Sequence, residues 1–312
     1  MQITDVREIL YRSNIDAGKI ELYKNNTNLK TYLINGKYVF KVSVSPIAEQ
    51  AKLNAVRPLK HVPEIHSSGL FAVSGCEYYY MIIDYLQGDD LWSVAWSLTD
   101  KEKYSIGKEI AEFLSKLQLI TDDYYDMGHY IPTIPRFAKS WKEGHLEYAR
   151  VLKNRISEIN LDKNSQKNIS KAFGYINANI WALEYQKGAG LLHNDFHPKN
   201  IIIHEGMFAG VIDWECSQYG EADFELSRLF DWYVYPEAYL FQENNLEILL
   251  KSIIENLQIL STIPHIEKRM TIYQLEHEVN QLIWHGKKQE KERINRIKGW
   301  LNGKVNDFLK II

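Results

Sequence analysis

The fold of this chain is decided by His193-Asn-Asp-Phe-His-Pro-Lys-Asn200, a loop that is soon followed by Val211-Ile-Asp-Trp-Glu215. Apolar residues stand on both sides of the loop, and a polar loop held between two apolar segments is typical of a rigid functional site. Asn200 follows Asp195 by five positions, and Asp213 ends the next apolar segment. The pattern therefore indicates a site that uses two carboxylates and one amide.

These three side chains suit the transfer of a phosphoryl group. That reaction needs a carboxylate to orient the attacking hydroxyl and accept its proton, and it needs oxygen ligands for Mg²⁺ on the nucleotide phosphates. The spacing of Asp195 and Asn200 matches the catalytic loops of kinases, His-x-Asp-x-x-x-x-Asn. We therefore predict that Asp195 is the catalytic carboxylate and that Asn200 and Asp213 are the Mg²⁺ ligands.

Together the two motifs resemble the aminoglycoside phosphotransferase and choline kinase-like superfamily, because Ile212-Asp-Trp-Glu215 stands where protein kinases have Asp-Phe-Gly. Tyr219-Gly-Glu-Ala-Asp-Phe-Glu-Leu226 is similar to the family's Gly-Asp-Pro-x-x-Asp-Leu-Ala stretch, with Glu225 in place of Asp. The resemblance covers residues 191–230. It implies an α+β, two-lobed protein kinase-like fold, with a small β-rich N-terminal lobe and a large, mainly helical C-terminal lobe.

The resemblance also implies nucleotide-binding residues in the N-terminal lobe. Tyr38-Val-Phe-Lys-Val42 resembles the family's third strand, whose lysine, here Lys41, contacts nucleotide phosphates. Glu49, on the next expected helix, is the nearest candidate for the ion-pair partner that positions Lys41, with Glu64 and Glu77 as alternatives. The family's hinge corresponds to the segment from Asp84 to Leu86, which contacts the base through the Asp84 carbonyl and the Leu86 amide.

The expected phosphate loop departs from the family pattern. Family members have a glycine between the first two strands, but Lys24-Asn-Asn-Thr-Asn28 contains none. We expect Thr27 and Asn28 to replace it with side-chain and backbone donors to the nucleotide.

Hydrophobic patterning agrees with two lobes. Before residue 87 the chain reads mostly as strands, with a hairpin turn predicted at Asn35-Gly36. The polar stretch Gln87-Gly-Asp-Asp90 follows, and then helical patterns begin, the first of them at the capping box Thr99-Asp-Lys-Glu102. We expect a nucleotide-binding lobe over residues 1–86 and a catalytic and substrate-binding lobe over residues 87–312.

Composition restricts the partners. The net charge is −3, with 37 basic and 40 acidic residues, so neither nucleic acid nor an anionic membrane is indicated. Cys76 and Cys216 form no Cys-x-x-Cys pair, which argues against a disulfide framework or a zinc site. A reducing cytoplasm fits best. The expected partners are a nucleoside triphosphate, ATP or GTP, and a small hydroxylated substrate.

The resemblance favours an aminoglycoside-type antibiotic as acceptor, and hence a role in antibiotic resistance. Acidic residues of the C-terminal lobe could face such a cationic substrate, although a solvated helix face explains them equally well. Aromatic residues nearby could line its pocket, with core packing as the default. The acids are Glu221, Asp223, Asp231, Glu237 and Glu243, and the aromatic residues are Trp214, Phe230, Trp232, Tyr233 and Tyr235.

Two other functions stay open. One is a metabolite kinase that acts on choline, a sugar or a similar alcohol. The other is a nucleotide-binding pseudokinase sensor, which the glycine-free loop favours and the intact Lys41, Asp195, Asn200 and Asp213 oppose. The sequence does not distinguish ATP from GTP and leaves the oligomeric state open.

Overall fold

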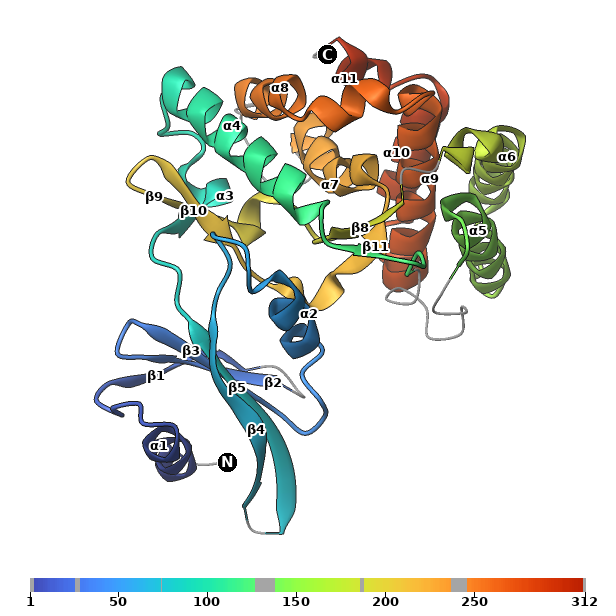
Figure 1. The fold of residues 1–312 in the computed structure, drawn as a ribbon. Coiled ribbons are helices and arrows are strands. Elements are labelled where there is room, and N and C mark those ends of the chain that lie inside the picture. The colour runs from blue at the N-terminus through green and yellow to red at the C-terminus, as the bar shows by residue number, and fades with distance from the viewer. Residues whose placement is uncertain are drawn as a thin grey trace. The chain divides into compact units, whose positions relative to one another are not determined.

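The computed structural model describes residues 3–25, 29–73, 75–126, 138–185, 188–236 and 246–310 (Figure 1). It divides into two compact units. The first comprises Met1–Val94 with Lys199–Cys216, and the second comprises Ala95–Pro198 with Ser217–Ile312. Residues 199–216, which we expected in the C-terminal lobe, therefore pack with the N-terminal unit. The division into functional lobes at residue 86 stays a prediction.

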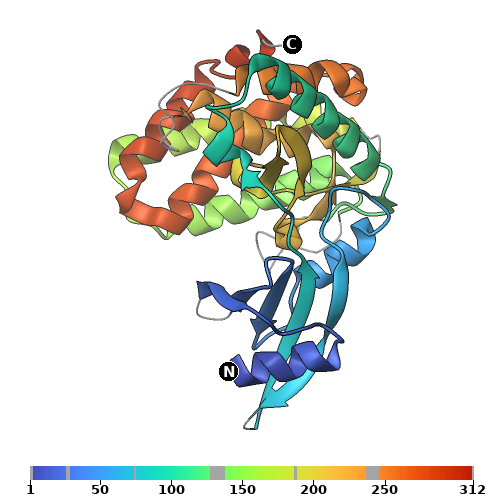
Figure 2. The same ribbon diagram turned by 90° about the vertical axis from the view of Figure 1, so that its left-hand side faces the viewer.

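The first unit is built on a five-stranded antiparallel sheet with the strand order β1-β2-β3-β5-β4 (Figure 2). Its strands are β1 (Ile20–Asn25), β2 (Leu29–Ile34), β3 (Tyr38–Ser43), β4 (Ile65–Val73) and β5 (Cys76–Asp84). The predicted hairpin turn joins β2 and β3, and Asn35 and Gly36 both have positive φ, at 54° and 65°. That is what a type I′ turn requires, and it fixes the register of β3.

Two helices accompany this sheet. Helix α1 (Ile3–Arg12) buries Val6, Ile9 and Leu10 against a cluster from β2, β3 and β5 that includes Phe40 and Ile82. Helix α2 (Glu49–Val56) follows β3 and contacts β4. The strand that carries Lys41 is thus held by α1 and by a strand on each side.

A smaller sheet of the first unit has the order β10-β9-β6, with β6 (Asp89–Asp90), β9 (Ile201–His204) and β10 (Met207–Val211). The short helix α3 (Leu91–Val94) and the 3-10 turn η3 (Trp214–Cys216) complete the unit. Gly88 permits the approach of β6 to β9, because its φ is +124° and a Cβ there would lie 2.2 Å from the carbonyl oxygen of Ile203.

The second unit is mainly helical, as predicted. It contains a small sheet with the order β11-β8-β7, and its helices pack around a core that includes Trp141 and Trp300. The strands are β7 (Thr121–Asp122), β8 (Ala189–Leu192) and β11 (Gln218–Gly220), and the helices are α4 (Asp100–Leu117), α5 (Trp141–Ser157), α6 (Lys163–Asn179), α7 (Ala222–Val234), α8 (Glu247–Asn256), α9 (Ile266–His285), α10 (Glu290–Leu301) and α11 (Asn306–Leu309). Single 3-10 turns are η1 (Ile180–Glu184), η2 (Pro198–Asn200), η5 (Gln258–Thr262) and η6 (Gly286–Lys288).

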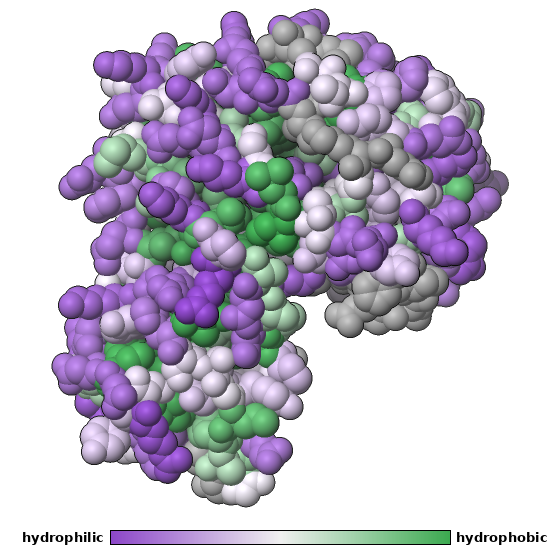
Figure 3. Space-filling model, in the orientation of Figure 1, coloured by the Kyte–Doolittle hydropathy of each residue, from purple (hydrophilic) through white to green (hydrophobic). Residues whose placement is uncertain are grey.

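Local signals place the helix ends. The capping box at α4 is confirmed, since the Glu102 amide donates to the Thr99 hydroxyl at 3.3 Å and the Thr99 amide donates to the Glu102 carboxylate at 2.7 Å. Gly286 caps α9 with a φ of 55°, as predicted. The visible surface is mostly hydrophilic (Figure 3). Within the described ranges, every helix is too short or too polar to cross a lipid bilayer.

Candidate functional site

The first unit contains a cavity of about 610 Å³, a size typical of small-molecule sites. It is lined by residues from β3, α2, the end of β5 and the turn after β10. Five of the predicted site residues line it, namely Lys41, Glu49, Asp84, Leu86 and Asp213. The fold thus gathers side chains that lie up to 172 positions apart in the sequence, from Lys41 to Asp213.

Lys41 and Glu49 form a buried ion pair at this cavity, with side-chain exposures of 14% and 3%. Burial alone would lower the pKa of Lys41, but the carboxylates of Glu49 and Asp213 outweigh it, and the pKa of Lys41 lies above its ordinary value. Lys41 therefore stays charged. A desolvated ammonium group held in place by a carboxylate can bind phosphate oxygens strongly.

Glu49 also holds the turn that carries Asp213. Its Oε2 binds Lys41, while its Oε1 accepts a hydrogen bond from the Trp214 amide at 3.2 Å. Asp213 has a φ of 67°, a conformation that non-glycine residues adopt only when their surroundings impose it. One carboxylate thus couples the positions of Lys41 and Asp213.

Asn200 lies beside the same turn. Its carbonyl oxygen accepts a hydrogen bond from the Ile212 amide at 3.0 Å, and the residue is buried. Its side chain is not among those that line the cavity. The carboxylate of Asp213 and the amide of Asn200 supply oxygen donors, which are the ligands that Mg²⁺ prefers. The donor set therefore fits this ion.

The hinge segment is held by its own hydrogen bonds. The Asp84 carboxylate accepts from the Glu64 amide at 3.0 Å and from His66 Nε2 at 2.6 Å. Among the described residues, no hydrogen bond engages the backbone amide of Leu86. Gly210 lets its strand approach the backbone at His61, since a Cβ at Gly210 would lie 2.6 Å from the His61 carbonyl oxygen, and it also leaves space for the Leu86 side chain. The hinge thus offers a backbone donor at the cavity.

Sequence reasoning missed four charged residues that line the cavity, namely Asp89, Asp90, Lys199 and Glu215, of which the last two lie in the quoted motifs. The Lys199 ammonium lies 5.1 Å from the centre of the Trp92 ring, and the charge of Glu215 helps to raise the pKa of Lys41. Both residues belong to the motifs that identified the family, so their position in those motifs was an available signal. Thr27 and Asn28 lie outside the described residues.

Asp195 belongs to the second unit, where helix α7 holds its loop. Glu225 accepts hydrogen bonds from the amides of His193, at 2.5 Å, and Asn194, at 2.9 Å. Asn194 has a φ of 65°, so the loop also adopts an unusual backbone conformation that its surroundings impose. His197 Nε2 lies 3.5 Å from a carboxylate oxygen of Asp195.

The pKa values of the two carboxylates at this loop, Asp195 and Glu225, shift in opposite directions. Burial alone would raise the pKa of Asp195, but the hydrogen bond and charge of His197, with Arg228, lower it to about 2. Burial raises the pKa of Glu225 to about 7, although its two backbone hydrogen bonds act in the other direction. Asp195 is therefore ionised at neutral pH and can orient a hydroxyl group and accept its proton.

Three of the acidic residues considered for a cationic substrate are buried and hydrogen-bonded, so both interpretations, a substrate-facing surface and a solvated helix face, are wrong for them. The Tyr125 hydroxyl donates to Glu221 at 2.8 Å. Asp223 binds Arg269 and Asp231 binds Arg296, with both carboxylates almost fully buried. Arginines that are distant in sequence thus neutralise the charges of Asp223 and Asp231. Glu237 and Glu243 lie outside the described residues.

The aromatic residues considered for a substrate pocket mostly pack in the core, and one of them contacts the catalytic loop. Trp214 and Phe230 are fully buried, as the core-packing default predicts, and the Trp214 ring donates to the Val211 carbonyl. Trp232 differs, because its ring stacks on the imidazole of His197 with 5.3 Å between ring centres and 16° between planes. Tyr233 and Tyr235 are half-buried.

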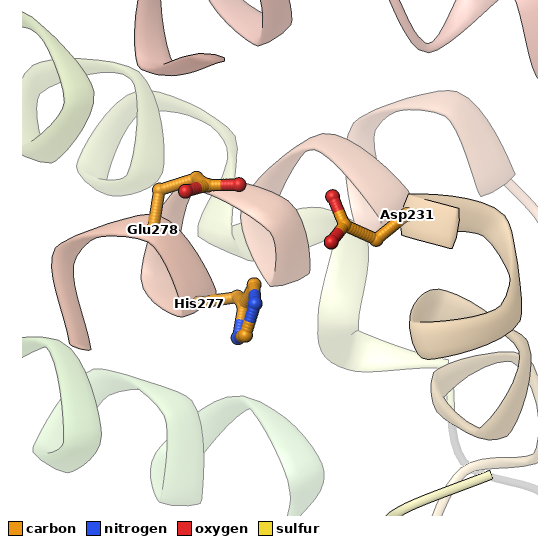
Figure 4. A group of neighbouring side chains, drawn as sticks. All are labelled: Asp231, His277 and Glu278. Carbon is orange, nitrogen blue, oxygen red and sulfur yellow. The ribbon is translucent and has the colours of Figure 1, made fainter. Parts of the chain in front are cut away.

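Helices α7 and α9 bring three ligand-type side chains within 4.8 Å of one another (Figure 4). They are Asp231, His277 and Glu278. Arg228 donates to Nδ1 of His277, Arg296 binds both carboxylates, and Arg293 binds Glu278 at 3.0 Å. These arginines already supply the positive charge that a metal ion would bring, so we interpret the cluster as a buried ion-pair network.

Comparison with known proteins identifies the family. Residues 23–245 match the phosphotransferase enzyme family. Hygromycin-B 4-O-kinase of Escherichia coli is 30% identical over 53 residues, a segment that spans 17% of this chain and only 16% of that protein.

Solved structures show the same fold over nearly the whole chain. Aminoglycoside phosphotransferase APH(4)-Ia, in a ternary complex with AMP-PNP and hygromycin B, has a TM-score of 0.68 at 17% identity, with 97% of this chain and 98% of that chain covered. ADP-bound APH(2'')-Ib has a TM-score of 0.64 at 19% identity, with 97% and 98% covered. The predicted kinase-like fold is confirmed, and since the family match extends over most of the sequence, the chain belongs to the phosphotransferase enzyme family.

Proposed function

We propose that this phosphotransferase is a small-molecule kinase that transfers the γ-phosphate of ATP or GTP to a hydroxyl group of an aminoglycoside-type antibiotic, and so confers resistance. The observation that carries the proposal is the convergence of Lys41, Glu49 and Asp213 on one cavity of the first unit. A charged lysine beside a carboxylate and a potential metal ligand suits the triphosphate of a nucleotide.

In this proposal the nucleotide is held by the first unit. Lys41 binds the α- and β-phosphates, and Glu49 orients Lys41 while it holds the turn at Asp213. The base contacts the Leu86 amide and the Asp84 carbonyl. Thr27 and Asn28 are proposed to replace the missing glycine of the phosphate loop.

Asn200 and Asp213 are the proposed ligands of Mg²⁺. Bound there, the ion would neutralise charge on the phosphates during transfer. Asp213 is held for this role by a constrained backbone, and the Asn200 carbonyl is fixed by the Ile212 amide.

Asp195 is the proposed base. Its low pKa keeps it ionised, so it can accept a hydrogen bond from the acceptor hydroxyl and take its proton as the bond to phosphorus forms. The same hydrogen bond orients the hydroxyl for attack on the phosphorus atom.

The acceptor is supported by relatives of similar fold. Solved neighbours are bound to hygromycin B, streptomycin and gentamicin. One observation favours the second candidate, a kinase for choline, a sugar or a similar alcohol. Burial of Glu221, Asp223 and Asp231 removes the acids that would attract a polycation. The cytoplasm remains our proposed location, which the two free cysteines support.

A transfer assay tests the proposal. Labelled ATP and GTP are supplied with Mg²⁺ and a panel of aminoglycosides and metabolite alcohols. Asp195→Asn should lower turnover about 10²- to 10⁴-fold, the usual range for loss of a general base. Asp123→Asn, a change at an exposed aspartate, is the matched control. Unchanged turnover in Asp195→Asn would refute the mechanism, and nucleotide binding without transfer to any acceptor would favour the pseudokinase sensor.

A further inference from the structure

Helix α7 presents three side chains to the loop that carries Asp195. Glu225, Arg228 and Trp232 are three and four positions apart, so they lie on one face of the helix. Glu225 binds the loop backbone, the charge of Arg228 acts on Asp195, and Trp232 stacks on His197. One helical face therefore contacts the loop by three different interactions.

Trp232 and His197 stack face to face. The two rings are nearly parallel, at 16°, and Trp232 is only 7% exposed. A flat aromatic surface fixes the plane of the imidazole, while the Asp195 carboxylate 3.5 Å away engages its Nε2. These two contacts together fix both the tilt and the rotation of the His197 ring.

Helix α7 is itself anchored to two other helices. The half-buried Arg228 donates to His277 of α9, and the buried Asp231 binds Arg296 of α10. Figure 4 shows that Asp231 projects from α7 towards Glu278 and His277 on α9. Breaking one partner of a buried ion pair is costly, so the rotation and register of α7 are well defined. A residue on α7 can therefore serve as a fixed support.

We propose that Trp232 is a positioning residue for phosphoryl transfer, which holds the His197 imidazole against the Asp195 carboxylate and thereby sets the orientation of that carboxylate towards the acceptor hydroxyl. The inference rests on the proposed function, in which Asp195 orients the hydroxyl. In this proposal Trp232 has a role beyond core packing, and His197 transmits the effect of Trp232 to the Asp195 carboxylate.

Two substitutions of Trp232 separate its flat surface from its bulk. Trp232→Phe keeps an aromatic face for the imidazole, whereas Trp232→Leu keeps apolar volume without that face. Trp300→Leu is the matched control, because Trp300 is also buried in the second unit and packs on Phe230 of α7 and on Tyr235, without a contact to His197. It reports the effect of losing a core tryptophan alone.

The first measurement requires no activity. In ¹H–¹⁵N spectra of the histidine side chains, with His197 assigned by His197→Ala, ring current from Trp232 should displace the His197 ring protons upfield. The displacement should persist in part in Trp232→Phe, disappear in Trp232→Leu and be unchanged in Trp300→Leu. An identical His197 signal in Trp232→Leu would refute the contact on which the inference stands.

The second measurement is steady-state kinetics of the full-length protein on its best acceptor. Trp232→Leu should lower kcat about tenfold, a typical effect of a misplaced catalytic group, with the KM for nucleotide within about twofold. Trp232→Phe should recover most of the loss. If Trp232 acts through His197, then Trp232→Leu should add nothing to the loss caused by His197→Ala.

Different outcomes would refute the positioning role of Trp232 and the proposed function. Additive losses in the double variant, in an active wild-type background, would refute the positioning role alone. A loss in Trp300→Leu equal to that in Trp232→Leu would refute it as well, because core packing would then explain both. A wild-type protein that transfers phosphate to no acceptor would refute the proposed function and the positioning role together.

Discussion

Glu225 is expected to reduce stability at the pH where it supports activity. The carboxylate is buried, and its pKa rises from 4.5 to about 7. At 1.36 kcal/mol per pKa unit, that displacement corresponds to about 3 kcal/mol. An acid whose folded pKa lies above its unfolded value binds more protons in the folded state, so the free energy of unfolding falls as pH rises from 4.5 to 7.

Glu225→Gln replaces the titrating group by a neutral one that resembles the protonated acid. We therefore expect the variant and the wild type to differ by less than about 1 kcal/mol near pH 5, and a more stable variant at pH 8.5, by up to about 3 kcal/mol. The side chain of Gln has one acceptor oxygen and an NH₂ group that only donates, so it cannot accept from His193 and Asn194 through two separate oxygens as the carboxylate does. Since the loop loses one hydrogen bond next to Asp195, kcat should fall while stability rises.

The assay is urea unfolding of both proteins at pH 5, 7 and 8.5, with kcat measured at the two higher values. Glu225→Asp, which restores the residue usual in the family, keeps a carboxylate and should retain the pH dependence. Glu158→Gln, at an exposed glutamate, should change neither quantity. A stability difference between Glu225→Gln and the wild type that is independent of pH, or a less stable variant at pH 8.5, would refute the reasoning.

Three further changes test the first unit. Lys41→Met should weaken nucleotide binding about tenfold or more, measured by calorimetry, because a charge-assisted bond to phosphate contributes about 1.5–3 kcal/mol; unchanged affinity would remove Lys41 from the site. Asp213→Asn should raise the Mg²⁺ concentration for half-maximal transfer about tenfold, as a metal titration would detect, whereas an unchanged midpoint would exclude it as a ligand. Gly88→Ala should cost about 1–3 kcal/mol in urea unfolding, since its Cβ would overlap the Ile203 carbonyl oxygen; a neutral effect would show that the strands can separate.

Features governed by neighbouring residues were predictable from the sequence. The hairpin at Asn35-Gly36 needs only two residues that tolerate positive φ, and the capping box at Thr99 needs two side chains three positions apart. The spacing of Asp195 and Asn200 was likewise sufficient to indicate a catalytic loop of the kinase type. In each case the decisive partners lie within one turn or one loop, so the pattern contains the whole interaction.

The roles of the buried acids depend on distant partners and could not be predicted. Asp223 reads as a surface residue near the start of a helix, until Arg269, 46 positions later, pairs with it inside the core. Glu276 on α9 is a second example. Burial raises its pKa, and His145, which lies 131 positions earlier in the sequence, partly offsets this shift through a hydrogen bond. Pattern analysis assigns charges to the surface by default, and only tertiary structure shows which of them are paired.

The residues proposed for the nucleotide and for the acceptor belong to different packed units. Lys41, Glu49 and Asp213 line a cavity of the first unit, while Asp195 is held by the second unit through Glu225. The chain passes from one unit to the other between Pro198 and Lys199, in the middle of the motif that identified the family. A substitution that loosens the first unit should therefore change nucleotide affinity, and one that loosens α7 should change turnover. Along the chain, the short segment between Asp195 and Asn200 thus links the residue proposed for the acceptor to those proposed for the nucleotide and Mg²⁺.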